Sequence, residues 1–447
     1  MPRKKKLNAA EELIQLLQLP PDVTVDHVDH ELEEDIFFLN LPVPLERTCP
    51  FCSSNDCIIR GSALTQSIRH IPVSGRKITL SITKRRFYCK CCEASFYDTP
   101  DWVLSRLRMS RNLYKAIFND LCEILPFTQI MKKEHVSERT IRSVFDSIEI
   151  LHPGNLPRTL CIDEFHAESG FWVKKSKHWS KDKYNVNVTD GERKIVVDVL
   201  QQRTLQYLSK YFRETYLPVQ RQAVKFFCCD MNGGFISLAK SCFPKAVIIV
   251  DNFHVVQLLT KAMDKIRCRE QDFLIDHNRK DDYARLKKLS RVLKTWDGNI
   301  EKYFQETASA KRKLMEEAFQ VSPNLQTMHG ALQDFHDIMM SYPASYQKEL
   351  LLEWINEYKS SDIPELKTAV GTIRLYRNYI INAWLYEKSN GPCEGLNKKI
   401  KDLKRSSFGI HSFESFRKRI LLTCGGLTPA SNQVILQIGE EGTSTWS

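Results

Sequence analysis

Two short apolar runs, each carrying an acidic residue near its end, are prominent in the hydrophobic pattern of this chain. One run covers residues 159–165 and contains Asp163, and the other covers residues 224–230 and ends at Asp230. Runs of this length, bounded by polar residues or by glycine and proline, are typical of buried strands. Each run therefore predicts a strand that presents a carboxylate at its C-terminal end.

The pattern around these strands predicts the order of elements in one domain. A hairpin with Asp190-Gly191 at its turn, a helix and a further strand are expected at residues 184–200, 235–242 and 246–251. The order strand, hairpin, helix, strand, helix, strand is that of an RNase H-like fold, whose first and fourth strands are adjacent. We therefore expect Asp163 and Asp230 to lie close together.

A third carboxylate, Glu394, opens a basic helical pattern far downstream. Two strand-end aspartates and a later helical glutamate are what a site for two Mg²⁺ or Mn²⁺ ions needs. Such hard ions prefer oxygen ligands and lie about 3.5–4 Å apart in two-metal sites. A helical insertion over residues 258–388 accounts for the gap before Glu394. Aspartates that only cap helices are the alternative.

Neighbouring residues are rivals for these assignments. Glu164 adjoins Asp163 but faces the other side of its strand, because side chains alternate along a strand. Asp251 ends the fifth strand, farther from the first, and is the rival of Asp230. We interpret Asp251 and His254 as residues that lie behind the metal ligands or face DNA, and a structural Asp–His pair explains them equally well.

Cations on the helix after Glu394 suit contact with a phosphate backbone beside these carboxylates. They are Lys398, Lys399, Lys401, Lys404 and Arg405. A solvated helix face is the alternative explanation.

Cysteine spacing predicts a metal site in the N-terminal part. Cys49 and Cys52 form one CxxC knuckle, and Cys89 and Cys92 form another across a predicted hairpin. Four thiolates close a tetrahedral structural Zn²⁺ site, here one ion per chain, in a zinc ribbon. Buried free cysteines are the alternative, and whether Cys91 or Cys92 is the fourth ligand stays open.

Basic residues in two places are candidate DNA contacts. Arg85 and Arg86 precede two aromatic residues, which suits phosphate contact and base stacking, although a solvated edge strand explains them nearly as well. Residues 125–144 read as helix, turn, helix with Ser137 as the N-cap of the second helix. Arg139 and Arg142 are then exposed where a recognition helix contacts DNA. Helical hairpins give such patterns by chance as well.

Composition limits the partners and the compartment. The chain has 447 residues, 42% hydrophobic and 10% aromatic, enough for two to four domains, and a net charge of +11 suits a polyanionic partner or simply a basic enzyme. No apolar run approaches the ~20 residues of a membrane span, and the basic N-terminus lacks a signal-peptide core. We expect a cytoplasmic protein whose 14 cysteines are thiols or metal ligands.

Taken in order, these motifs resemble bacterial insertion-sequence transposases of the ISL-three family. The matching pieces are the two CxxC knuckles, Ile162-Asp163-Glu164-Phe165, Phe243-Pro244-x-Ala246, Asp251-x-Phe253-His254-Val255, Ser389-Asn390-x-x-x-Glu394-Gly395-Leu396-Asn397-x-Lys399-Ile400-Lys401 and Arg405-x-x-Phe408-Gly409. The resemblance covers about residues 45–424. It implies a zinc ribbon, a helix-turn-helix and a DDE core interrupted by a helical insertion, with Asp163, Asp230 and Glu394 as the triad. The sequence that follows Asp230 matches the family more loosely than the other pieces.

We therefore expect a multidomain α+β and α/β chain that acts as a DNA transposase, a metal-dependent polynucleotidyl transferase. Its partners would be double-stranded DNA, both element ends and target, and a second copy in a homodimer or higher oligomer; it would be nucleoid-associated, away from membranes. The alternatives are a zinc-dependent DNA-binding regulator with an inactive core and an RNase H-like nuclease without strand transfer.

The expected domain division follows the motifs along the chain. It comprises an N-terminal helix and acidic linker, the zinc ribbon, the helix-turn-helix region, the first part of the core, the helical insertion, the C-terminal helices of the core and a tail, at residues 1–45, 46–100, 101–152, 153–257, 258–388, 389–424 and 425–447.

Overall fold

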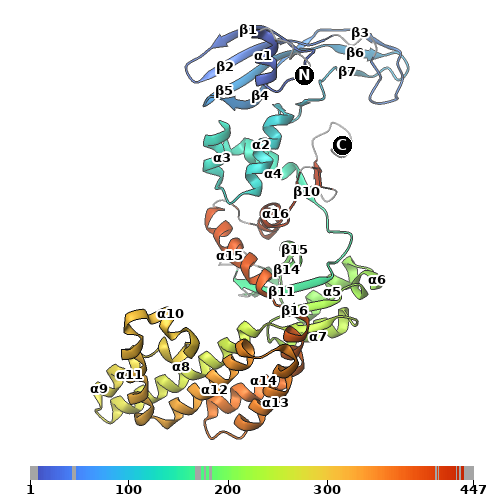
Figure 1. Cartoon of the computed structure of the whole chain (residues 1–447). Helices are drawn as coiled ribbons and strands as arrows, with labels where there is room; N and C mark the ends of the chain where they lie inside the picture. The colour runs from blue at the N-terminus through green and yellow to red at the C-terminus, as the bar shows by residue number, and fades with distance from the viewer. Residues whose placement is uncertain are drawn as a thin grey trace, which may run out of the picture. The chain divides into compact units, whose positions relative to one another are not determined.

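The chain forms two compact units, one of residues 1–153 with 398–447 and the other of residues 154–397. A computed structural model describes residues 9–42, 47–166, 173–175, 178–180, 184–407, 410, 412–428, 430–431 and 434–436. Most of the predicted C-terminal tail, including residues 437–447, lies outside this described part. Figure 1 shows the elements of both units along the chain.

The first unit is built on a six-stranded sheet of order β1-β2-β5-β4-β9-β8. Its strands are β1 (Thr24–His30), β2 (Glu34–Asn40), β4 (Leu64–Val73), β5 (Arg76–Lys84), β8 (Val103–Leu104) and β9 (Met109–Ser110). Helix α1 (Ala9–Leu16) packs on this sheet through Ile14, in a core that also holds Ile68 and Leu80. The predicted hairpin is present as β4 and β5, with Ser74 and Gly75 both at positive φ in its turn.

The acidic segment before the cysteines differs from the predicted linker. Strands β1 and β2 pair as an antiparallel hairpin, and β2 pairs in parallel with β5. Acidic and histidine residues hide the alternation in the sequence, yet Phe37 and Leu39 are buried on one side of β2, as the two-residue period of a strand requires.

The cysteine knuckles belong to a separate three-stranded sheet of order β3-β6-β7. Its strands are β3 (Cys57–Ile59), β6 (Arg86–Cys89) and β7 (Ser95–Tyr97). The β4–β5 hairpin, which we predicted as part of the ribbon, instead belongs to the six-stranded sheet. The reason is that its buried face, including Ile78 and Leu80, packs in the core of that larger sheet.

Helices follow the sheets in the first unit. They are α2 (Arg111–Cys122), α3 (Phe127–Glu134), α4 (Glu138–Ser147) and, from the C-terminal region, α16 (Phe413–Cys424). A strand pair of β10 (Ile148–Ile150) and β18 (Val434–Leu436) joins the two chain segments of this unit. In the predicted helix-turn-helix region at 101–152, the first helix thus begins at Arg111, after the short strands β8 and β9.

The second unit contains a five-stranded sheet of order β15-β14-β11-β16-β17. Its strands are β11 (Thr159–His166), β14 (Tyr184–Asp190), β15 (Ile195–Leu200), β16 (Phe226–Cys229) and β17 (Val247–Val250). Strands β11, β16 and β17 run parallel, while β14 and β15 form the antiparallel hairpin that we predicted. The described part also includes the short pair β12 (Val173–Lys175) and β13 (His178–Ser180).

A close approach explains the glycine at the β14–β15 turn. A Cβ on Gly191 would lie 2.8 Å from Cys161 Sγ and 2.9 Å from Thr159 Cγ2, so a side chain does not fit there. The Asp190 carboxylate accepts hydrogen bonds from the N–H groups of Glu192 and Arg193, which closes the turn.

Side chains of this sheet alternate between two apolar clusters. One cluster packs against helices α5 (Leu205–Thr215) and α7 (Gly233–Cys242) and includes Leu160, Ile162, Val186, Val188, Phe227, Cys229 and Val250. The other lies on the opposite face and comprises Cys161, Cys228, Ile249, Ala383 and Cys393. A short helix, α6 (Pro218–Gln222), precedes β16.

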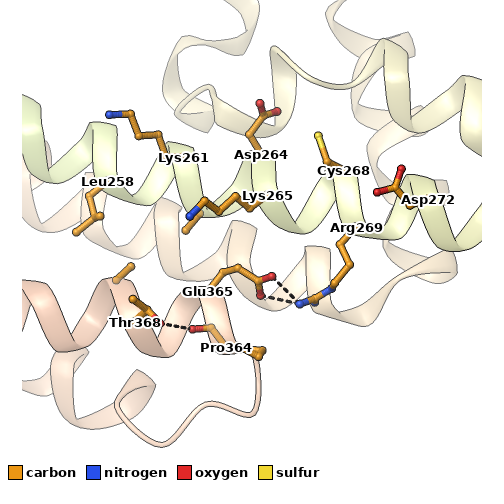
Figure 2. A pocket seen from close by; sticks show the side chains of 12 residues that line it. Leu258, Lys261, Asp264, Lys265, Cys268, Arg269, Asp272, Pro364, Glu365 and Thr368 are labelled. Carbon is orange, nitrogen blue, oxygen red and sulfur yellow. Dashed lines mark hydrogen bonds and ion pairs between the residues drawn. The ribbon is translucent and has the colours of Figure 1, made fainter. Parts of the chain in front are cut away.

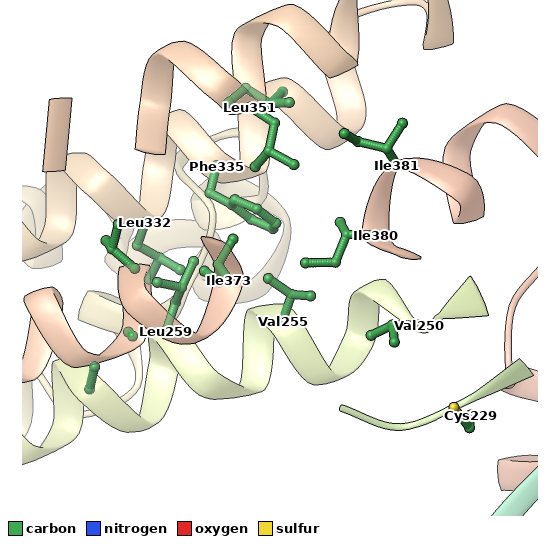
Figure 3. Packing of buried hydrophobic residues seen from close by; sticks show 14 of the residues in the cluster. Cys229, Val250, Val255, Leu259, Leu332, Phe335, Leu351, Ile373, Ile380 and Ile381 are labelled. Carbon is green, nitrogen blue, oxygen red and sulfur yellow. The ribbon is translucent and has the colours of Figure 1, made fainter. Parts of the chain in front are cut away.

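Helices occupy the chain from Asn252 to Ser406, a stretch that begins in the second unit. They are α8 (Asn252–Asp276), α9 (Lys280–Lys288), α10 (Ile300–Phe304), α11 (Ala308–Val321), α12 (Pro323–Ser341), α13 (Ala344–Tyr358), α14 (Pro364–Tyr386) and α15 (Gly391–Ser406), the last of which continues into the first unit. Figure 3 shows Val255, Leu259, Phe335 and Ile373 packing between α8, α12 and α14. These buried contacts between helices explain the long helical pattern that we predicted over residues 258–388. The first of the helices, α8, begins at Asn252, six residues before the predicted start.

The prediction of a mixed α/β multidomain chain with a zinc ribbon region and a large helical part is therefore confirmed. Within the described residues, no helix is long and apolar enough to cross a membrane.

Candidate active site and zinc site

Four cysteine sulfurs converge in the first unit. The Sγ atoms of Cys49, Cys52, Cys89 and Cys92 all lie within 4.8 Å of one another, and the Cys49–Cys92 and Cys52–Cys89 pairs are each 3.6 Å apart. Sulfurs bound tetrahedrally to zinc at 2.3 Å lie about 3.8 Å apart. The set therefore fits one structural Zn²⁺, and Cys91 is exposed outside it.

Backbone N–H groups assist this site. Hydrogen bonds from the N–H groups of Cys92 and Cys91 lower the pKa of Cys89 to about 6 against the opposing effect of burial. Thiolate is the form that binds zinc, so these N–H groups favour the ligand state at Cys89. At Cys52 a backbone hydrogen bond from Ser54 lowers the pKa, but burial and the neighbouring thiols outweigh it and raise the pKa.

The predicted helix pair is present as α3 and α4, joined by residues 135–137. Ser137 caps α4 by accepting from Thr140 N, and His135 takes the left-handed conformation at the end of α3. Arg139 is exposed on α4, whereas Arg142 bonds Glu138 at 2.5 Å and lies over the Phe127 ring. In the ribbon, Arg86 is exposed and Arg85 is half-buried.

Strand register brings two predicted carboxylates together in the second unit. Cys161 of β11 pairs with Cys228 of the parallel strand β16. Two residues further on, Asp163 therefore lies opposite Asp230. Because side chains alternate along strands, both aspartates belong to the face that carries Cys161 and Cys228.

The first turn of α15 places Glu394 on the same face. Cys393 is fully buried beside Cys161 and Cys228, and its sulfur lies 3.5 Å from Thr189 Oγ1 of β14. Glu394 follows Cys393 in the helix and therefore lies at the edge of the buried face. Glu394 and Asp230 are accordingly about one quarter exposed.

His254 lies between two of the three carboxylates. Its Nε2 is 2.6 Å from Asp230 Oδ1 and 3.2 Å from Glu394 Oε1. Burial lowers the pKa of His254, but contact with Asp230 and the charges of Glu394 and Asp163 outweigh burial and raise it. From the sequence we interpreted His254 as a residue that lies behind the metal ligands or faces DNA, and the structure places its ring against Asp230 and Glu394.

Crowding of acidic groups is strongest at Asp163. Burial and the neighbouring charge of Asp230 raise the pKa of Asp163 to about 7. Such a group gains most from a nearby cation, since its charged form is otherwise disfavoured.

Three asparagines, which sequence reasoning did not single out as site residues, surround the carboxylates. Asn397 donates to Asp163 Oδ2 at 2.7 Å, and Asn187 donates to Asn397 Oδ1 at 3.0 Å. Asn390 donates to Asp230 Oδ1 at 3.3 Å and to Ile162 O at 3.2 Å. Asn390 and Asn397 are part of the sequence motif around Glu394, and this position in the motif could have indicated them as site residues.

The rival carboxylates have other partners. Asp251 caps α8 by accepting from Phe253 N and also accepts from Asn390 N, so it holds the segment that leads to Glu394. Glu164 pairs with Arg203 at 2.7 Å and accepts from Asn232.

The donor set fits hard divalent cations. Three carboxylates converge, and Asn390 Oδ1 is buried without a hydrogen-bond partner in the described part of the chain, which leaves one more oxygen for an ion or its water. Among the described residues, only the cysteine group brings three or more metal-ligating atoms within 4.8 Å of one another. The carboxylate oxygens are therefore more widely spaced than the cysteine sulfurs.

The basic residues after Glu394 differ in their contacts and in their exposure to solvent. Lys399 donates to Thr423 O of α16 at 3.2 Å, and Arg405 pairs with Asp402. Lys398 and Lys401 are exposed, and Lys404 is half-buried.

A groove of about 760 Å³ lies away from the carboxylates, between α8 and α14. Figure 2 shows that its lining carries both signs of charge, with Arg269 paired to Glu365 at 2.6 Å across the groove. Asp163, Asp230 and Glu394 do not line it.

Comparisons with known proteins identify the family. A family model described as a transposase, of the ISL3 DDE type, matches residues 160–420, and one described as the zinc-finger of transposase IS204/IS1001/IS1096/IS1165 matches residues 46–92. The chain therefore belongs to the ISL3 family of DDE transposases, as the sequence motifs predicted.

A relative that matches most of the chain agrees with this assignment. The chain is 19% identical over 363 residues to the transposase for insertion sequence element IS1001 of Bordetella parapertussis. This alignment covers 79% of this chain and 83% of the relative. It is 30% identical over 128 residues to a protein of Lactococcus lactis subsp. lactis named ATP-dependent protease, covering 28% of this chain and 39% of that protein. The chain is thus a DNA transposase with a structural zinc site.

Proposed function

We propose that the second unit is an RNase H-like core in which Asp163, Asp230 and Glu394 hold two Mg²⁺ or Mn²⁺ ions. The observation that carries the proposal is the strand register, which sets the two aspartates opposite each other on the face beside Glu394. The sheet order, with the first strand central between the hairpin and the two later parallel strands, supports it. Helices α8 to α14 would then be the insertion between core strands and α15.

When bound, the ions supply Lewis-acid activation of the attacking water or 3′-hydroxyl and stabilise the departing 3′-oxygen. The residues of the chain have the remaining roles. Asp163, Asp230 and Glu394 supply the oxygens, and His254 balances the charge of Asp230 and Glu394. Asp251 holds the backbone ahead of Glu394 through Asn390.

Recognition of DNA is assigned to the first unit. Arg139 and Arg142 on α4 would contact the element end, with Arg85 and Arg86 of the ribbon contacting the backbone. Lys398, Lys399, Lys401, Lys404 and Arg405 on α15 would add contacts with phosphates, and of these Lys399 also donates to Thr423 O and Arg405 pairs with Asp402. The protein would act on the bacterial nucleoid, as a homodimer or higher oligomer that pairs two ends.

An assay on labelled element-end DNA tests the proposed reaction. The zinc-loaded protein should release 3′-hydroxyl ends and join them to target DNA with Mg²⁺ or Mn²⁺, and should do neither in EDTA. Cleavage without joining would indicate a nuclease, and binding without cleavage an inactive regulator.

A further inference from the structure

The carboxylate of Asp163 is held at both oxygens by neutral donors. Asn397 Nδ2 donates to Oδ2 at 2.7 Å, and the backbone N–H of Glu164 donates to Oδ1 at 2.7 Å. A carboxylate has about four lone-pair directions, so these bonds leave roughly two free. The side chain is fixed in orientation while it still has oxygen lone pairs to offer an ion.

A second asparagine orients the first. Asn187 Nδ2 on β14 donates to Asn397 Oδ1 at 3.0 Å, and Thr189 Oγ1 donates to Asn187 Oδ1 at 3.1 Å. Asn187 and Thr189 are fully buried, and Asn397 is 6% exposed. With its oxygen occupied by Asn187, the amide of Asn397 can present only its N–H group to Asp163.

We propose that Asn397, oriented by Asn187, is a positioning residue that presets Asp163 for divalent metal; this rests on the metal site proposed above. An amide suits the task because it carries no net charge. A lysine or arginine in its place would neutralise Asp163 and compete with the ion, whereas Asn397 restrains the carboxylate and leaves its charge for the metal.

The same relay fixes the spacing between elements. It runs from β14 through α15 to β11, so it joins the helix that carries Glu394 to the strand that carries Asp163. Loss of the relay should therefore weaken metal binding at the site more than it weakens the fold.

Mn²⁺ binding to the full-length, zinc-loaded protein, followed by electron paramagnetic resonance, tests the proposal. Manganese is chosen because it prefers oxygen ligands and leaves the thiolate site to zinc. The variants are Asn397→Ala and Asn187→Ala, with Asp163→Asn as the loss-of-site reference. The matched control is Asn185→Ala, because Asn185 is a buried asparagine of the same strand that donates to Gln201 O instead of into the site.

Removing Asn397 should raise the Mn²⁺ dissociation constant about 10- to 100-fold, the usual effect of losing a residue that orients a metal ligand. Asn187→Ala should raise it less, and Asn185→Ala should leave it unchanged even if all three lower the melting temperature. Wild-type affinity in Asn397→Ala, with binding abolished in Asp163→Asn, would overturn this inference alone. Binding that Asp163→Asn does not weaken would instead overturn the proposed metal site, and this inference with it.

Discussion

Nε2 of His254 lies 2.6 Å from Oδ1 of Asp230. The same nitrogen is 3.2 Å from Glu394 Oε1, so one imidazole contacts two of the three carboxylates proposed to bind metal. It joins Asp230, which follows the end of β16, to Glu394 of α15, which lies 394 − 230 = 164 positions later along the chain. His254 is therefore part of the candidate site that these carboxylates form.

Replacing His254 by alanine should lower strand cleavage about 10- to 100-fold and leave end binding nearly unchanged, because the carboxylates lose the group that spaces them. His254→Gln, which keeps a polar N–H group, should recover part of the loss. Cleavage rates and filter-binding affinities measured side by side check this. His277→Ala is the control, since His277 is exposed at the other end of α8; an equal effect of both alanine variants would contradict the role.

Purified protein should contain one Zn²⁺ per chain, measured by elemental analysis. Cys52→Ser should lose the metal and the end-binding activity, because three thiolates bind zinc more weakly than four and the ribbon depends on the ion. Cys91→Ser should keep the full zinc content, since Cys91 lies outside the converging sulfurs. Zinc loss in Cys91→Ser with full retention in Cys92→Ser would mean that the fourth ligand is misassigned.

Arg139→Ala should weaken binding to the element end more than binding to random DNA, by about 1–3 kcal/mol if it contacts a base. Arg142→Ala should have a smaller effect, because Arg142 already bonds Glu138 and lies over Phe127. Competition assays at fixed salt separate the two kinds of binding. Equal losses on both DNAs would show that α4 only contacts phosphates.

Arg419→Met should destabilise the first unit by roughly 2–4 kcal/mol, because it leaves buried carbonyls without donors. The guanidinium is 1% exposed and donates to Leu121 O, Glu123 O and Leu125 O, which ties α16 to the end of α2. Burial lowers the pKa of Arg419 to about 10, so it stays charged at neutral pH. Chemical denaturation measures the effect, and an unchanged midpoint would contradict it.

The sequence predicted the elements whose signals are local. The strands at Asp163 and Asp230, the hairpin between them, the Ser137 cap and the paired CxxC knuckles all follow from short patterns. The acidic strands β1 and β2 were missed because their alternation is weak and they are held by strand pairing, β1 with β2 and, at long range, β2 with β5. Arg419 attaches α16 to the end of α2, and the carbonyl groups that accept its hydrogen bonds lie almost 300 residues away in sequence.

Contacts within the site were harder to predict for the same reason. His254 and Asn397 meet the carboxylates across 24 and 234 positions of sequence, and Asn187 is linked to them through Asn397. Polar residues of these types occur throughout the chain. The register of β11 and β14 sets Asn187 opposite Asp163, whereas the positions of His254 and Asn397 depend on how α8 and α15 pack on the sheet.

The most direct test of the catalytic assignment measures cleavage and joining of element-end DNA in Mg²⁺ by Asp163→Asn, Asp230→Asn and Glu394→Gln. Each change keeps the size of the side chain and removes a metal-binding charge, so each should abolish both steps while folding and end binding persist. Losing several kcal/mol of transition-state stabilisation corresponds to a loss of at least about a thousandfold, since ~1.36 kcal/mol is tenfold in rate. Asp251→Asn should reduce activity less, because Asp251 caps α8 and holds Asn390. Full activity in Asp230→Asn with none in Asp251→Asn would contradict the account and make Asp251 the second catalytic aspartate.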